Sequence, residues 1–223
     1  RPVVPDLRTL EGLTAQQLED LNRSRLEYLS GGLVVLTPQM RKITGQVERL
    51  IVENQGRNSG LHGLIIYGES TMGKTTTAKM AMRRVYHKYS QVYPGMRRES
   101  RIPIVYVEVP PGASGKALVR RFAAFLQLPV PHQETAESTM GRVVNLLDRA
   151  GTRLVVVDEL HNLRLRNSGS GEAVDFLKSL SNQLHATFVY LGIDLNDSEL
   201  FSGPRGRQIT GRFISAPLRP FTW

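Results

Sequence analysis

The sequence GESTMGKTTT, residues 68–77, decides the fold. It follows the short apolar run GLIIY at 63–67 and precedes a segment with a helical pattern, residues 75–89. A glycine, four residues and then Gly-Lys-Thr between a strand and a helix is the pattern of a phosphate-binding loop. Glycines let backbone N–H groups turn inward around a phosphate, and the helix N-terminus adds the positive end of its dipole. The alternative is an ordinary glycine turn with a chance Lys-Thr pair.

This loop predicts a site for a nucleoside triphosphate with Mg²⁺. Lys74 is expected to bridge the β- and γ-phosphates as a point charge, and the Thr75 hydroxyl is expected to bind the metal. The residues predicted to contact the nucleotide here are Gly68, Glu69, Ser70, Thr71, Met72, Gly73, Lys74, Thr75 and Thr76.

The segment RLVVVDELHNL, residues 153–163, supplies the acids that such a site needs. Its apolar residues end in Asp158 and Glu159, and ligands of open α/β sheets bind at the carboxyl ends of the strands. We expect Asp158 to hold Mg²⁺, usually through water, and Glu159 to orient or deprotonate the attacking water. The alternative for Glu159 is a cap on the following helix or an ion pair with an arginine. His161 follows closely, but a lone histidine is more often structural than catalytic.

Apolar runs recur along the chain and predict an α/β fold. They are short, rich in β-branched residues and do not alternate with polar residues, as in strands buried on both faces of a parallel sheet. The runs lie at residues 64–67, 104–109, 154–157, 188–191 and 213–216, with helical patterns at 75–89, 114–126, 139–149 and 171–185 between the first four. This alternation predicts a five-stranded parallel sheet with helices on both faces. We expect residues 1–55 to form a helical N-terminal extension, including a helix at 38–54, and residues 56–223 to form the nucleotide-binding core.

Composition narrows the class of protein. The 223 residues contain no cysteine, which excludes disulfides and cysteine metal sites and fits a reducing cytoplasm. No apolar run approaches the roughly 20 residues that span a bilayer, so we expect no membrane partner. The net charge of +9 makes an acidic partner plausible, with nucleic acid as the first candidate.

Two polar residues near the later apolar runs are candidates for reading the γ-phosphate. Asn182 lies just before the fourth run and can both donate and accept hydrogen bonds. The alternative is a local cap at a helix end. Arg212 immediately precedes the fifth run, and a guanidinium supplied by a neighbouring subunit can stabilise the transition state. A solvated surface loop is the alternative for Arg212.

Basic residues gather at two further places that are candidates for contact with the DNA backbone. One group shares the predicted helix at 114–126, and the other lies on the charged loop at 91–101. The predicted DNA-binding residues are Lys116, Arg120 and Arg121 in the first group, and Arg97 and Arg98 in the second. Such contacts would be tolerant of sequence and sensitive to salt. A solvated charged face is an equally good interpretation.

Val34 and Val35 are candidates for a wall of the adenine pocket, or for plain core.

These motifs together resemble the TniB-like transposition ATPases of the AAA+ superfamily, relatives of the Mu-type transposition helper. The resemblance rests on GESTMGKTT, LVVVDELHNL, LKSLSNQLHATFVYLGID and RQITGRF, and covers the chain from about residue 28 to the end. It implies an ATPase that uses ATP and Mg²⁺ and assembles on double-stranded DNA as a homo-oligomeric ring or filament. It also implies a transposase and a target-selection adaptor protein as partners. In this resemblance Lys74 and Thr75 are the phosphate-loop pair, Asp158 and Glu159 the acids, and Arg212 the arginine finger.

Two features depart from the family pattern. The family usually has a small hydroxyl residue after the glycine that ends the fourth strand, whereas Ile193 follows Gly192 here. AAA+ proteins also carry a helical lid after the core, and we expect this lid to be absent or truncated after residue 223.

Three other functions stay open at this point. A helicase loader or replication initiator of the same superfamily shares the nucleotide motifs. A signalling NTPase would use the nucleotide as a switch for protein binding, with no role for DNA. A metabolic kinase would need a pocket for an acceptor substrate and no arginine from a neighbour.

Overall fold

The computed structural model describes residues 5–30, 34–163, 170–193 and 211–220. A parallel sheet of five strands stands at its centre, in the order β2-β3-β4-β1-β5. The strands are β1 (Gly63–Tyr67), β2 (Ile104–Glu108), β3 (Leu154–Asp158), β4 (Thr187–Gly192) and β5 (Phe213–Pro217). The predicted α/β sheet is confirmed, and each strand lies within a residue or two of its apolar run.

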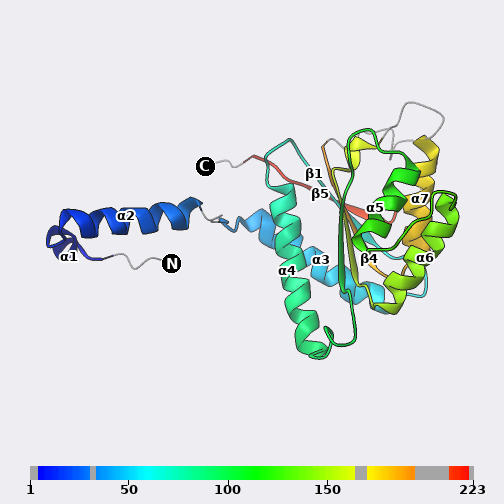
Figure 1. Cartoon of the computed structure of the whole chain (residues 1–223), viewed down its shortest axis with the longest axis horizontal. Coiled ribbons are helices and arrows are strands. Elements are labelled where there is room, and N and C mark those ends of the chain that lie inside the picture. The colour runs from blue at the N-terminus through cyan, green and yellow to red at the C-terminus, as the bar shows by residue number, and fades with distance from the viewer. Residues whose placement is uncertain (1–4, 31–33, 164–169, 194–210, 221–223) are drawn as a thin grey trace. The chain divides into compact units, whose positions relative to one another are not determined.

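Helices cover both faces of this sheet, as Figure 1 shows. On one face lie α3 (Pro38–Gln55) and α4 (Lys74–Val92), and on the other lie α5 (Gly115–Phe125), α6 (Ala136–Arg149) and α7 (Ser170–Gln183). The two faces explain why the strands are apolar throughout. In β3, Leu154 and Val156 pack toward α3 and α4, whereas Val155 and Val157 pack toward α5 and α7. No helix among the described ranges is both long and apolar enough to cross a membrane.

The chain divides into an N-terminal unit, Arg1–Thr37, and a core unit, Pro38–Trp223. The first holds α1 (Leu7–Glu11) and α2 (Ala15–Ser30), which bury no side chain. The division falls before α3, and not after residue 55 as expected from the sequence. Helix α3 belongs to the core unit because Ile43, Val47 and Leu50 pack against β1 and β4.

A buried asparagine fastens the end of α3 to the sheet. The amide of Asn54, 3% exposed, donates to the His62 carbonyl at 2.8 Å and to the Thr187 hydroxyl at 2.9 Å, and its oxygen accepts from the His62 N–H at 2.9 Å. Since these residues precede β1 and begin β4, the helix is held at the edge where the strands begin. We call this side of the sheet the amino edge and the opposite side the carboxyl edge.

The parallel topology decides which segments can meet. Each strand ends at the carboxyl edge, so the turns from β1 into α4 and from β2 toward α5 lie there, as does the turn after β3. Helix α4 then runs back, so the turn from α4 into β2 lies at the amino edge, where α7 also ends before β4.

Candidate nucleotide-binding site

The loop between β1 and α4 has the backbone that a phosphate cradle requires. Gly73 has φ of +83° immediately before α4 begins, and Thr71 is also left-handed, with φ of +67°. A non-glycine residue in that region is uncommon, and strained residues of this kind cluster at active sites and ligand-binding loops. Helix α4 thus begins at Lys74 with the amide groups of its first turn at the loop.

The Lys74 amine lies inside this loop. The side chain is 7% exposed, and its Nζ donates to the carbonyl oxygens of Gly68 at 2.8 Å and Glu69 at 2.7 Å. A buried ammonium needs partners, and here they are neutral carbonyls rather than a carboxylate. The arrangement leaves the positive charge of Lys74 available to a phosphate.

Asp158 lies against the first turn of α4, as the sequence predicts. The carboxylate is 1% exposed, and its Oδ2 accepts from the Thr75 hydroxyl at 2.7 Å. The contact follows from the pleat, because Asp158 shares the α4-facing side of β3 with Leu154 and Val156. A hydroxyl and a carboxylate side by side are hard oxygen ligands of the kind that Mg²⁺ prefers, so these residues fit that ion.

Tyr106 is a member of the site that sequence reasoning missed. It lies on β2 beside Val156 and its hydroxyl donates to Oδ2 of Asp158 at 2.9 Å. Burial, and then the hydrogen bond to Asp158, raise the pKa of the Tyr106 phenol well above its usual value. The signal was the tyrosine within an otherwise aliphatic run, but only the strand register shows which residue it meets. With the Glu159 N–H donating to Oδ1 at 2.8 Å, both oxygens of Asp158 are held.

Glu159 follows in a left-handed conformation, with φ of +56°, which turns the chain into the short 3-10 helix Leu160–Asn162. Its side chain makes no cap on that helix and pairs with His161, at 3.2 Å from Oε2 to Nε2. Among the residues that the structure describes, the Glu159 side chain therefore neither caps this helix nor pairs with an arginine. His161 Nδ1 in turn accepts from the Ile193 N–H, at 3.4 Å, just after β4.

Asn182 and Arg212 are two predicted catalytic residues that lie away from the phosphate loop of their own chain. Asn182 lies in the last turn of α7, and Arg212 Nη1 donates to its Oδ1 at 3.0 Å. Arg212 in turn precedes β5, and its carbonyl accepts from the Gly63 N–H at 3.0 Å, at the start of β1. The five residues of β1 separate this place from the phosphate loop by about 16 Å. The prediction that Asn182 reads the γ-phosphate of its own chain is thus wrong, because proximity to β4 in sequence put it at the opposite end of that strand.

Arg212 therefore lies at the amino edge of the sheet, whereas the phosphate loop of its own chain lies at the carboxyl edge. The position is set by Phe213, whose ring stacks on Tyr190 with centroids 4.7 Å apart and covers Gly63. At this distance Arg212 cannot reach the phosphate loop of its own chain. Its role as an arginine finger that acts on a neighbouring subunit stays a prediction.

The two predicted DNA-binding groups are exposed but lie on different elements of the core unit. Lys116, Arg120 and Arg121 are on α5, which begins at the carboxyl edge. Arg97 and Arg98 lie in the turn between α4 and β2, at the amino edge. The groups do not form one continuous patch around the site. Their contact with DNA stays a prediction.

Val34 and Val35 lie in the N-terminal unit, whereas the phosphate loop lies in the core unit. Their assignment to an adenine pocket stays a prediction.

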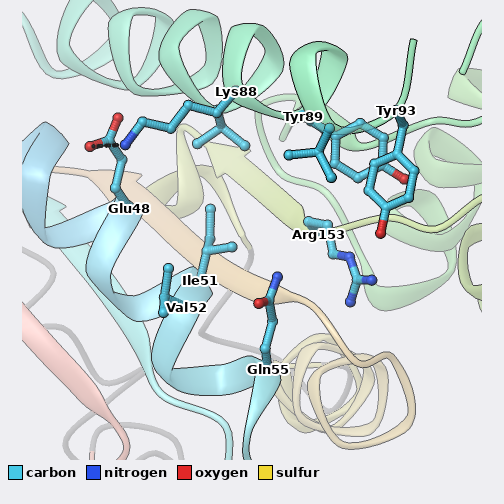
Figure 2. A pocket seen from close by; sticks show the side chains of 10 residues that line it. Glu48, Ile51, Val52, Gln55, Lys88, Tyr89, Tyr93 and Arg153 are labelled. Atoms are coloured by element: carbon cyan, nitrogen blue, oxygen red, sulfur yellow. Dashed lines mark ion pairs between the residues drawn. The ribbon is translucent and has the colours of Figure 1, made fainter.

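A cavity of about 340 Å³ between α3 and α4 is separate from this site (Figure 2). Ile51 and Val52 of α3 line it on one side and Tyr89 and Tyr93 of the α4 segment on the other, and Arg153 lies near Tyr93 at the end opposite Glu48. An ion pair of 3.1 Å between Glu48 and Lys88 crosses one end. No residue of the phosphate loop lines it, so this cavity is distinct from the candidate nucleotide site.

Comparison with known proteins agrees with this arrangement. The model of the family described as "Bacterial TniB protein" matches residues 25–223. No curated protein matches the chain.

Solved structures share the fold at low sequence identity. The ORC1 protein of Aeropyrum pernix, in complex with DNA, is 19% identical with a TM-score of 0.61, covering 84% of this chain and 47% of that one. The ORC2 protein of the same organism, in ADPNP–ADP complexes, is 17% identical with a TM-score of 0.53, covering 83% and 50%. Cdc6p of Pyrobaculum aerophilum is 18% identical with a TM-score of 0.52, covering 83% and 47%. The chain spans about half the length of these proteins, and their likeness shows the AAA+ P-loop fold.

Proposed function

The chain belongs to the TniB family, and we propose on this premise that it is an ATPase that binds DNA in its ATP-bound form and regulates DNA transposition. The observation that supports the enzymatic part most strongly is the contact between Thr75 and Asp158 beside the buried amine of Lys74. The hydroxyl, the carboxylate and the ammonium are the three groups that a phosphate loop needs around Mg·ATP.

Each of these residues has a task in the proposed hydrolysis. Lys74 exchanges its two carbonyl partners for the phosphate oxygens and offsets their charge. Thr75 and Asp158 would hold the metal, which would supply positive charge against the developing charge of the phosphates. Glu159 accepts a hydrogen bond from the attacking water and draws its proton.

The place of Arg212 favours a homo-oligomer. Because it lies at the amino edge, its guanidinium is available to the γ-phosphate of a neighbouring subunit. Such an arginine is worth on the order of 10³–10⁵ in rate. Hydrolysis then depends on assembly, and a ring or filament on double-stranded DNA is the form that we propose. A transposase and a target-selection adaptor are the proposed protein partners, and the cytoplasm is the proposed place.

A replication initiator of the same superfamily is the second candidate. The observation that favours it is the likeness in fold to Cdc6p and to the ORC1 protein, whose structure was solved in complex with DNA. The family match over residues 25–223 favours transposition.

Nucleotide binding, hydrolysis and assembly on duplex DNA test the proposal together. Lys74→Ala should abolish ATP binding, and Glu159→Gln should keep binding but lower kcat by about 10²–10⁴-fold, as expected on loss of a general base. Lys79→Ala is the control, because Lys79 is an exposed lysine of the same helix α4.

Electron microscopy of wild type with duplex DNA and ATP should show rings or filaments, and Lys74→Ala should show none. Monomers with both ligands at high protein concentration would reject the assembly on DNA. Assembly that survives Lys74→Ala would reject its dependence on ATP.

A further inference from the structure

A chain of contacts joins the carboxyl end of β4 to Glu159 through His161. The Ile193 N–H donates to Nδ1 of His161 at 3.4 Å, and the other ring nitrogen, Nε2, lies 3.2 Å from Oε2 of Glu159. The imidazole therefore links Glu159, which follows β3, to Ile193, which follows β4, and the two strands are neighbours in the sheet.

The direction of the first bond decides where the ring proton lies. A backbone N–H can only donate, so Nδ1 must be the unprotonated nitrogen, and the proton of the neutral ring is on Nε2. Nε2–H then donates to the Glu159 carboxylate. A neutral histidine in this one tautomer satisfies both neighbours.

Both side chains are partly open to solvent, 28% exposed for His161 and 36% for Glu159. A glutamate there has several rotamers, whereas the hydrogen bond from Nε2 favours one. This hydrogen bond therefore holds Oε2 of the Glu159 carboxylate.

We propose that His161 is a positioning residue, which orients Glu159 for hydrolysis and ties that orientation to the end of β4. The inference rests on the proposed ATPase function. His161 lies in the short 3-10 helix after β3, and through it the Ile193 backbone after β4 is linked to the Glu159 carboxylate.

Two substitutions separate the two contacts. In His161→Asn the amide oxygen takes the place of Nδ1 and still accepts from Ile193, but nothing reaches Glu159. In His161→Gln the amide nitrogen takes the place of Nε2 and still donates to Glu159. We expect His161→Asn to lower kcat by about 10-fold with KM for ATP unchanged, the order expected for freeing one immobilised side chain. His161→Gln should stay within about 3-fold of wild type.

The double variant His161→Asn with Glu159→Gln tests whether the histidine acts through the glutamate. It should have the kcat of Glu159→Gln alone, because a residue that only orients Glu159 has no further effect once that carboxylate is gone. An additional loss in the double variant, an unchanged kcat in His161→Asn, or an equal loss in His161→Gln would overturn the proposal.

Nitrogen-15 NMR of the histidine rings gives a readout that needs no turnover. At pH 7.5 and without nucleotide, His161 should be the Nε2–H tautomer, and Glu159→Gln should shift its Nε2 resonance. A Nδ1–H tautomer, or no shift, would overturn the proposal even if the protein proved inactive. A wild-type protein without hydrolysis, or an unchanged rate in Glu159→Gln, would reject the proposed function instead.

Discussion

Replacing Gly68 with alanine should destabilise the core unit at the point where the phosphate loop leaves the sheet. Gly68 has φ of +152°, a region that residues with a Cβ rarely adopt. A Cβ at this position would lie 2.5 Å from the Leu218 carbonyl oxygen, on the backbone that follows β5. Because a backbone atom cannot rotate aside, either the loop or the end of β5 must move.

The structure sets the size of the effect. A strained backbone conformation costs about 1–3 kcal/mol. Moving Leu218 also weakens the hydrogen bond from its N–H to the Tyr67 carbonyl, 2.7 Å long, and a bond of this kind contributes about 0.5–1.5 kcal/mol. Together we expect Gly68→Ala to lower the free energy of unfolding by about 2–4 kcal/mol.

Gly45→Ala is the matched control. Gly45 lies within α3, has an ordinary φ, and an added Cβ would meet nothing within 4 Å. Alanine there should raise the free energy of unfolding by up to about 1 kcal/mol, because glycine is the poorer helix former. Urea unfolding of both variants, with equal m-values, measures the difference. Gly68→Ala within 0.5 kcal/mol of wild type, a threshold near the usual size of surface effects, would refute this reasoning.

Three further experiments test other parts of the account. Arg212→Ala should lower kcat by about 10³-fold or more with nucleotide binding unchanged, and mixing it with Lys74→Ala subunits should restore activity, since each supplies what the other lacks; no restoration would argue against action between subunits. Lys116→Glu with Arg121→Glu should weaken DNA binding and reduce its salt slope by about 2, whereas Lys79→Glu with Arg83→Glu, an equal change in charge on exposed residues of α4, should have less effect because neither belongs to a predicted DNA-binding group; equal losses would point to net charge alone. Tyr106 has a pKa raised by burial and by Asp158, so the stability that it contributes is present below its unfolded pKa of about 10 and is lost as the pH rises toward the folded value. Urea midpoints of Tyr106→Phe should therefore fall less steeply above pH 10 than those of wild type, and parallel curves would contradict the assignment.

The strands and the phosphate loop could be read from the sequence because their signals are local. Val155, Val156 and Val157 are apolar on both faces of β3, and this continuous run marks a strand covered by helices on each side. Gly73, Lys74 and Thr75 mark the loop in the same way. Parallel topology then brings Asp158 to the same edge, so the pairing with Thr75 was predictable without knowing the strand order.

The partners of single side chains were not predictable in this way. Tyr106 meets Asp158 because β2 and β3 are neighbours in a register that places Tyr106 beside Val156, which no local pattern states. His161 meets Ile193 for the same kind of reason, since β4 lies next to β3. Asn182 was misplaced because a residue just before a parallel strand lies a full strand length from the edge where ligands bind.

The most direct measurement of the central claim is a structure of the protein with Mg²⁺ and a non-hydrolysable ATP analogue. We predict that the γ-phosphate will lie within hydrogen-bonding distance of Lys74 Nζ, with the metal on the Thr75 hydroxyl and Asp158 beside it. An analogue bound instead in the cavity between α3 and α4, or a loop that stays empty at saturating ligand, would contradict the account.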